Sequence, residues 1–137
     1  MSIQFIHLNK GWNAEPNAPE ESIKTFESKL TLEFFVNPWA YEGFEEEQKI
    51  KLIFASVSKY RLGETNDEGW YRGECRFKKL APKWGEFYQL IGEDSDIENA
   101  DDWIILSQEK ELNHYLFYFR DNTFECFAKS YEKSKDS

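Results

Sequence analysis

Hydrophobic and polar residues alternate along much of this chain with a period of two, which is typical of half-buried β-strands. The clearest alternation lies between Lys29 and Val36, where every second residue is apolar: Leu30, Leu32, Phe34 and Val36. Asn37 and Pro38 end this predicted strand. Similar patterns predict further strands over residues 1–10, 48–62, 70–77, 86–91 and 103–106, the last of them short and buried.

The last third of the chain predicts a hairpin. Two alternating segments, 113–120 and 123–131, are separated by Asp121 and Asn122, which tolerate the positive φ angles of a two-residue type I′ turn. This register predicts a core face that holds three pairs, Phe119 with Phe124, Phe117 with Cys126 and Tyr115 with Ala128. On the other face it pairs Tyr118 with Glu125, Leu116 with Phe127 and His114 with Lys129, a mixture that is unusual for a purely solvated surface.

These elements predict a mostly β fold, either an antiparallel β-sandwich or a small β-barrel of about 7–8 strands, with at most one short helix. Residues 20–28 form either that helix or part of a loop. Residues 11–19 are expected to be an ordered loop pinned by Trp12, residues 63–69 a hairpin loop and residues 92–102 an acidic loop. We expect a single globular domain over 1–137, with about residues 131–137 fraying as a charged tail.

Composition adds two constraints. Twelve Phe, seven Tyr and five Trp predict a mainly aromatic core. The 26 acidic against 17 basic side chains give a net charge of −9, which disfavours binding to nucleic acid or to an anionic membrane and mildly favours a basic protein partner. The sequence shows no secretory signal pattern, so we expect a cytoplasmic protein with reduced, buried thiols at Cys75 and Cys126.

Residue patterns for metal binding and catalysis are weak. The acidic run 93–102 has Asn99 where a calcium loop requires Gly and Ile105 where it requires Glu, and the two His and two Cys lack zinc-ligand spacing. Cys126 and His114 point to opposite faces of the predicted hairpin, so they cannot form a catalytic pair there. We therefore expect no metal, no cofactor and no catalytic residue.

Aromatic residues in or beside turns are the remaining signal. Exposed rings mixed with Asn, Glu and Arg are typical of binding surfaces. Together with the mixed face of the hairpin, they suggest a ligand-binding set made of Trp12, Trp70, Arg72, His114, Tyr118, Arg120 and Glu125.

Four segments, 11–19 (GWNAEPNAP), 65–77 (TNDEGWYRGECRF), 81–88 (APKWGEFY) and 118–126 (YFRDNTFEC), resemble a family of small bacterial proteins without a known function. The resemblance extends over most of the chain. It implies a bacterial cytoplasmic protein and brings with it no activity, cofactor or site residue.

Three functional hypotheses follow. The leading one is a non-catalytic, acidic interaction domain for a basic protein partner. The alternative is a small-molecule or carbohydrate-binding domain with its site between the aromatic loops and the mixed face. The third is a hydrolase that uses Glu125 or Glu74 with Arg72 or Arg120 nearby.

Overall fold

A computed structural model describes residues 4–9, 12–14, 20–37, 48–63, 86–91, 103–118 and 123–135. These residues form strands and connections without a helix, and none of them belongs to a helix that could span a membrane. The strands are β1 (Gln4–His7), β2 (Ser22–Phe26), β3 (Lys29–Phe35), β4 (Lys49–Ala55), β5 (Lys59–Gly63), β6 (Phe87–Ile91), β7 (Ile104–Ile105), β8 (Asn113–Tyr118), β9 (Thr123–Ala128) and β10 (Ser130–Lys135).

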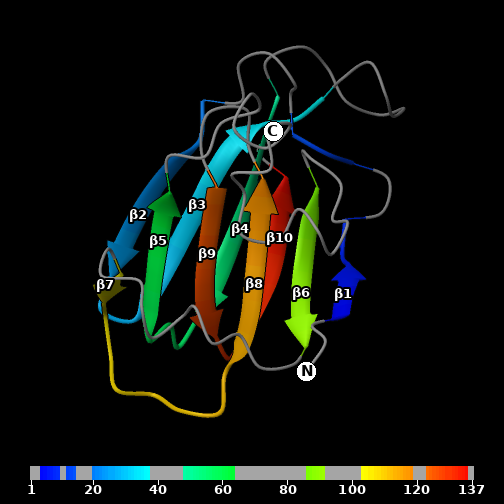
Figure 1. Ribbon diagram of the computed structural model, residues 1–137. Helices are drawn as coiled ribbons and strands as arrows, with labels where there is room; N and C mark the ends of the chain where they lie inside the picture. Colours follow the sequence, from blue (N-terminus) through cyan, green and yellow to red (C-terminus); the bar gives the residue numbers. More distant parts are fainter. Residues whose placement is uncertain are drawn as a thin grey trace.

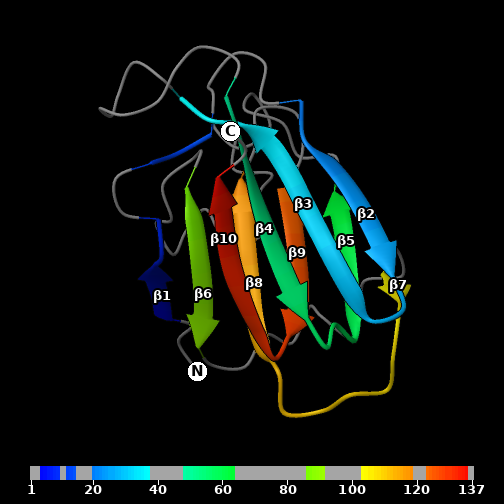
Figure 2. The ribbon, with the colours of Figure 1, turned by 180° about the vertical axis from the view of Figure 1, so that it is seen from behind.

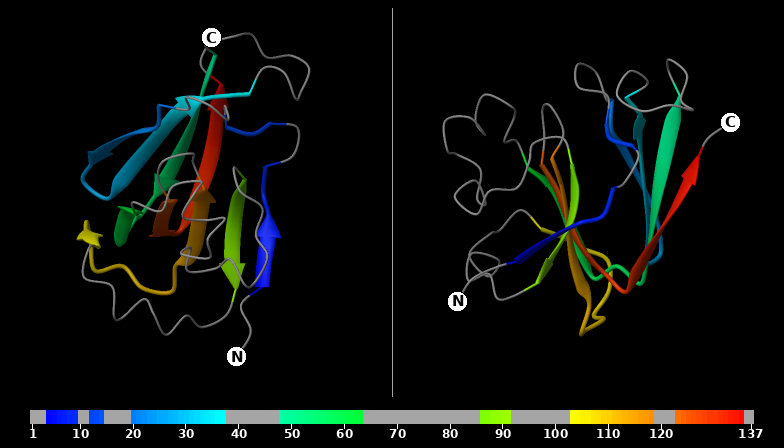
Figure 3. Two further views of the ribbon diagram at one scale, coloured as in Figure 1. Left: turned by 45° about the horizontal axis from the view of Figure 1, so that its top comes forward. Right: turned by 90° about the vertical axis from the view of Figure 1, so that its right-hand side faces the viewer.

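The strands form two antiparallel sheets packed face to face. One sheet has six strands in the order β1-β6-β8-β9-β5-β7, and the other has four in the order β10-β4-β3-β2. The six-stranded sheet is in front in Figure 1 and the four-stranded sheet is in front in Figure 2. The two layers are seen edge-on in the right-hand view of Figure 3. The predicted all-β, antiparallel fold is confirmed, and of the two expected architectures the structure is the β-sandwich.

The core between the sheets was predicted to be mainly aromatic, and among the described residues seven of its 16 buried members are aromatic. Alternation works as expected on β3, whose Leu30, Leu32 and Phe34 all point inward and are fully buried. Phe34 meets Phe117 of the facing sheet with 5.0 Å between ring centroids. Such tilted and edge-to-face contacts stabilise aromatic pairs beyond the area that they bury.

The prediction of a single strand over residues 48–62 is wrong, because the structure has two strands there, β4 and β5. Ser56 has a positive φ of 53°, and the chain turns after it from β4 in one sheet to β5 in the other. Val57 is buried at this corner, and its N–H donates to the Ser28 carbonyl. The sequence lacks a Gly or Pro at this point, so the break left no local signal.

The predicted hairpin is present, but its register differs. Tyr118 pairs with Thr123, so four residues (119–122) connect the strands in place of the predicted two, and Tyr118 is not opposite Glu125. The same shift pairs Phe117 with Phe124 and Leu116 with Glu125. Because the shift is by two residues and side chains alternate with a period of two, the residues from His114 to Phe117 and from Phe124 to Ala128 keep their predicted faces.

Residues 131–135, part of the segment 131–137 that was expected to fray, instead belong to β10, which pairs with β4. The chain bends at Lys129, whose N–H donates to the Ala55 carbonyl, and passes from the six-stranded to the four-stranded sheet. Tyr131 packs edge-on against Phe87 of the core, with ring centroids 5.1 Å apart. The inward ring of Tyr131 therefore attaches β10 to the core, although the other residues of β10 are charged or polar.

Two further expectations need correction. Residues 20–28, predicted as a helix or loop, contain β2, an edge strand whose Ile23 packs against the core. The strand predicted at 103–106 exists as β7, but Ile104 and Ile105 are exposed and not buried, because β7 is the edge strand beyond β5. The strand predicted at 70–77 and the loops at 64–69 and 92–102 lie outside the described residues.

Candidate functional site

The candidate site lies on the outer face of the six-stranded sheet, which we define as the face turned away from the four-stranded sheet. Such a face is ordinarily solvated in a two-layer sandwich. Here it is largely buried, and its buried residues come from the three central strands β6, β8 and β9: Tyr88, Leu90, His114, Leu116 and Glu125.

His114 and Glu125 form the polar centre of this face. His114 Nε2 lies 2.9 Å from Glu125 Oε1, and the two residues are 8% and 3% exposed. The imidazole ring also stacks on Phe127 at 4.4 Å between centroids, nearly parallel at 19°. A carboxylate on one side and a ring beneath it hold the imidazole in one orientation.

Arg61 provides a second partner for the buried carboxylate. Arg61 is opposite Glu125 in the pairing of β5 with β9, and its Nη1 lies 3.8 Å from Glu125 Oε2. A buried carboxylate is costly unless it is paired. Glu125 meets this requirement through one neighbour on each side, His114 on β8 and Arg61 on β5.

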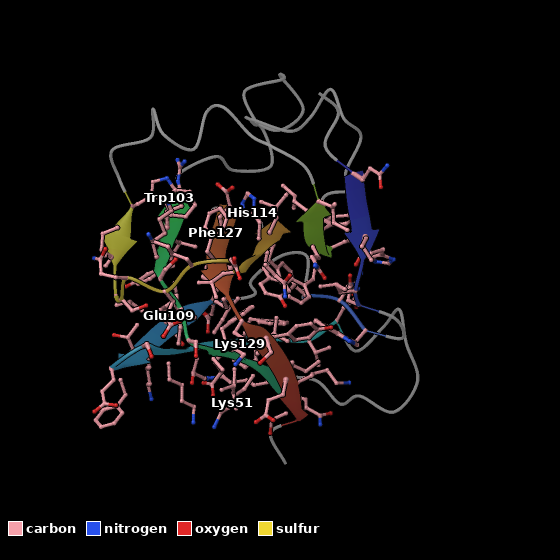
Figure 4. All side chains as sticks on the ribbon, turned by 90° about the horizontal axis from the view of Figure 1, so that it is seen from below. Lys51, Trp103, Glu109, His114, Phe127 and Lys129 are labelled. Atoms are coloured by element: carbon pink, nitrogen blue, oxygen red, sulfur yellow. The ribbon has the colours of Figure 1, made fainter. Side chains whose placement is uncertain are left out.

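Next to this charged group is a cation–aromatic cluster, which we define as Lys59, Arg61, Trp103 and Phe127. Lys59 Nζ lies 5.0 Å from the centroid of the Trp103 ring and 5.3 Å from that of Phe127. The Arg61 guanidinium carbon is 5.6 Å from the Trp103 centroid. Figure 4 shows Trp103, Phe127 and His114 together on the outer side of the six-stranded sheet.

The other histidine also lies next to a carboxylate. His7 Nε2, on edge strand β1, is 3.7 Å from Glu86 Oε2. Glu86 also accepts a hydrogen bond from Asn9 Nδ2, and Asn9 Oδ1 accepts one from the Phe87 N–H. The buried Asn9 therefore joins the end of β1 to the start of β6, which makes this group structural.

The structure brings together two residues of the predicted ligand-binding set, His114 and Glu125. Trp12 lies elsewhere: it is buried between the sheets and stacks on Phe34, so the structure places it in the core. The side chain of Tyr118 and all of Trp70, Arg72 and Arg120 lie outside the described residues.

The ligand-binding set predicted from the sequence does not include Lys59, Arg61, Trp103 and Phe127. Lys59 and Arg61 alternate with Tyr60 and Leu62, which is a strand signal that would have placed both cations on one face. One continuous strand over residues 48–62 groups these two cations with Lys49 and Lys51 on one face, which does not assign them to a site in the other sheet. No local pattern places Trp103 over Phe127.

The thiol at Cys126 is separated from His114, as predicted. Cys126 is fully buried in the core, on the opposite face of β9 from Glu125. Burial, reinforced by the neighbouring Glu125 carboxylate, raises the pKa of the Cys126 thiol well above its usual value. The thiol is therefore kept neutral, which is the opposite of what a nucleophilic cysteine requires.

Among the described residues, no group of three or more His, Cys, Asp and Glu side chains could hold a metal ion. The acidic run considered for calcium, 93–102, lies outside these residues. In chemical terms, the outer face offers an oriented imidazole, a paired carboxylate, two cations and two large aromatic rings. Comparisons of the chain with protein-family models, with curated proteins and with solved structures found no match.

Proposed function

We propose that this chain is a binding domain that holds a small molecule against the outer face of the six-stranded sheet, beside His114, Glu125 and Arg61. The observation that carries the proposal is the 2.9 Å His114–Glu125 pair, buried on the sheet face that does not form the sandwich core. The proposal favours the alternative hypothesis from the sequence over the leading one.

The energetics of buried ion pairs support this proposal. A buried Glu carboxylate that is held by Arg and His contributes little to stability compared with well-packed apolar residues, so its presence needs another explanation. Neighbouring β6 and β8 fill the same face with Leu90 and Leu116, so apolar packing is available there. Charged groups that converge beside large apolar surfaces are typical of ligand sites.

A thermal-shift screen against sugars, nucleotides, metal ions and common metabolites tests this proposal. A ligand that binds only the folded state raises the melting temperature by mass action. We expect a hit that is lost in His114→Gln and kept in Thr31→Ala, a control on the outward side of β3. A screen without hits, or a hit equally strong in His114→Gln, would contradict the proposal.

A second candidate is the interaction domain for a basic protein, favoured by the distribution of charge along the sequence. The described residues carry ten Lys and Arg against nine Glu, so they do not account for the net charge of −9. The excess acid lies in two runs, 38–47 with four Glu and 92–102 with six Asp and Glu, neither of which contains a base.

This second candidate is tested by affinity capture from native lysate at low and high salt, with a variant in which the six acids of 92–102 are replaced by Asn and Gln. We expect a basic partner that is released by salt and absent with the variant. Capture that is unaffected by both changes would eliminate the candidate.

A further inference from the structure

Charges in the cation–aromatic cluster are not balanced within the described residues. Lys59 and Arg61 alternate on β5 and therefore point to the same face of the sheet. Among the described residues, the Glu125 carboxylate lies within salt-bridge distance of Arg61, at 3.8 Å. Lys59 forms no ion pair with any described residue, and its ammonium lies over the rings of Trp103 and Phe127.

A hydrogen-bond donor in the same cluster also lacks an acceptor. Nε1 of Trp103 is buried and has no hydrogen-bond partner among the residues that the structure describes. A buried donor without an acceptor loses its hydrogen bonds to water without replacement, so such a group needs an explanation, for example a ligand, ion or water that accepts from it. The Trp103 side chain as a whole is only partly buried, so a turn of the indole could expose the N–H to an acceptor.

An anionic ligand accounts for both observations, because it would pair with the Lys59 ammonium and accept a hydrogen bond from Trp103 Nε1. We propose that the ligand of the outer face is a small oxyanion, a carboxylate or phosphate group bound by Lys59 and Trp103 Nε1, with Arg61 adding positive charge. This inference rests on the proposed function and names its ligand class. Hydrogen bonds between a cation and an oxyanion are shorter and stronger than neutral ones, and Lys has three donors to offer.

The surrounding side chains suit such a ligand. Phe127 and Trp103 provide apolar ring surface for the organic part of a carboxylate, as the aromatic walls of ligand sites commonly do. Glu125 is held by His114 and Arg61, which keeps its negative charge paired and reduces its repulsion of an approaching anion. Among the described side chains of the site, two cations, Lys59 and Arg61, therefore accompany one carboxylate, Glu125.

The test is isothermal titration of the full chain with benzoate, with inorganic phosphate and with benzamide, the neutral analogue of benzoate. Lys59→Met removes the ammonium and keeps the apolar stem, and Lys24→Met is the matched control on exposed strand β2. We expect benzoate or phosphate to bind at least about tenfold more tightly than benzamide, and Lys59→Met to weaken that binding about tenfold. Lys24→Met should change it less than about twofold. Whether benzoate or phosphate binds more tightly then distinguishes a carboxylate site from a phosphate site.

Tryptophan fluorescence adds an independent readout. Binding should change the emission of the wild-type chain, and Trp103→Phe should remove most of that change because the inference places Trp103 in direct contact with the ligand. If neither benzoate nor phosphate bound more tightly than benzamide, or if Lys59→Met and Lys24→Met had equal effects, the oxyanion inference would be overturned. A neutral hit that His114→Gln abolishes would then keep the proposed function, whereas the absence of every hit would end both.

Discussion

His114 and Glu125 meet across adjacent strands as diagonal neighbours, with 2.9 Å between Nε2 and Oε1. Their direct partners across β8 and β9 are Phe127 and Leu116, so each polar residue lies opposite an apolar one. In this arrangement Glu125 lies directly opposite Arg61 of β5, and the His114 ring stacks on the ring of Phe127. A charged group is thereby built into an otherwise apolar part of the sheet.

Glu125→Gln should destabilise the fold by about 2–4 kcal/mol, because it removes the charge that compensates Arg61 and weakens the bond to His114. Urea unfolding of the variant measures this loss. Glu33→Gln is the control, since Glu33 pairs with Lys49 and Lys51 on a partly exposed surface. It should cost less than about 1 kcal/mol, and equal losses for the two variants would contradict the burial of the His114–Glu125 pair.

Trp12→Ala should cost about 3–5 kcal/mol, because the indole fills the core beside Phe34, Phe87 and Phe117. Ligand affinity of the folded fraction should stay within about twofold of the wild type, since Trp12 lies between the sheets and not on the outer face. Unfolding curves and titration of the milder Trp12→Phe separate the two effects. A selective loss of binding with unchanged stability would return Trp12 to the ligand-binding set.

Tyr131→Ala should destabilise the protein by about 2–4 kcal/mol, because Tyr131 attaches β10 to the core through Phe54, Phe87 and Tyr115. The neighbouring Glu132 is exposed, so Glu132→Ala should change stability by less than about 0.5 kcal/mol. If both variants were as stable as the wild type, the C-terminal residues would be a frayed tail.

Stability should fall as the pH rises above the ordinary thiol value of 9.0, and Cys126 should contribute to the fall. Burial raises the pKa of Cys126 in the folded state, so above pH 9.0 the unfolded chain releases a proton that the folded chain keeps. The slope from one such group is at most about 1.4 kcal/mol per pH unit. The raised pKa values of Tyr115 and Tyr131, also caused first by burial, act in the same direction at higher pH.

Urea unfolding at about pH 8 and about pH 10 measures this slope, with Cys126→Ala as the comparison. The variant should be less stable at both values but lose less stability between them. An identical pH slope would show that Cys126 titrates in the folded state as an ordinary thiol.

Much of the fold could be predicted because alternation is a local property. The pattern of β3 follows directly from four apolar residues at every second position. The two faces of the hairpin were predicted correctly although the predicted register is wrong, because the register error is an even number of residues. The crossing at Ser56 could not be predicted, since a non-glycine residue with positive φ leaves no composition signal. Strand β10 was missed because its attachment depends on a distant contact between Tyr131 and Phe87.

The candidate site was predictable only in part, because some of its residues come together through local alternation and others through contacts between distant segments. His114 and Glu125 share a face of one hairpin, so their proximity follows from local alternation. Arg61 reaches Glu125 from β5, and Trp103, the residue before β7, reaches Phe127. Strand β5 joins β9, and β7 joins β5, through non-local pairing. Long-range strand order is not determined by the spacing of residues within any one segment.

The most direct test of the central claim is a ¹H–¹⁵N correlation spectrum recorded while the strongest ligand from the screens is titrated into labelled protein. The account predicts that the shifted amides cluster on the outer face of β5, β8 and β9, around Arg61, His114 and Glu125. Shifts confined to the four-stranded sheet, or no shifts at saturating ligand, would contradict it.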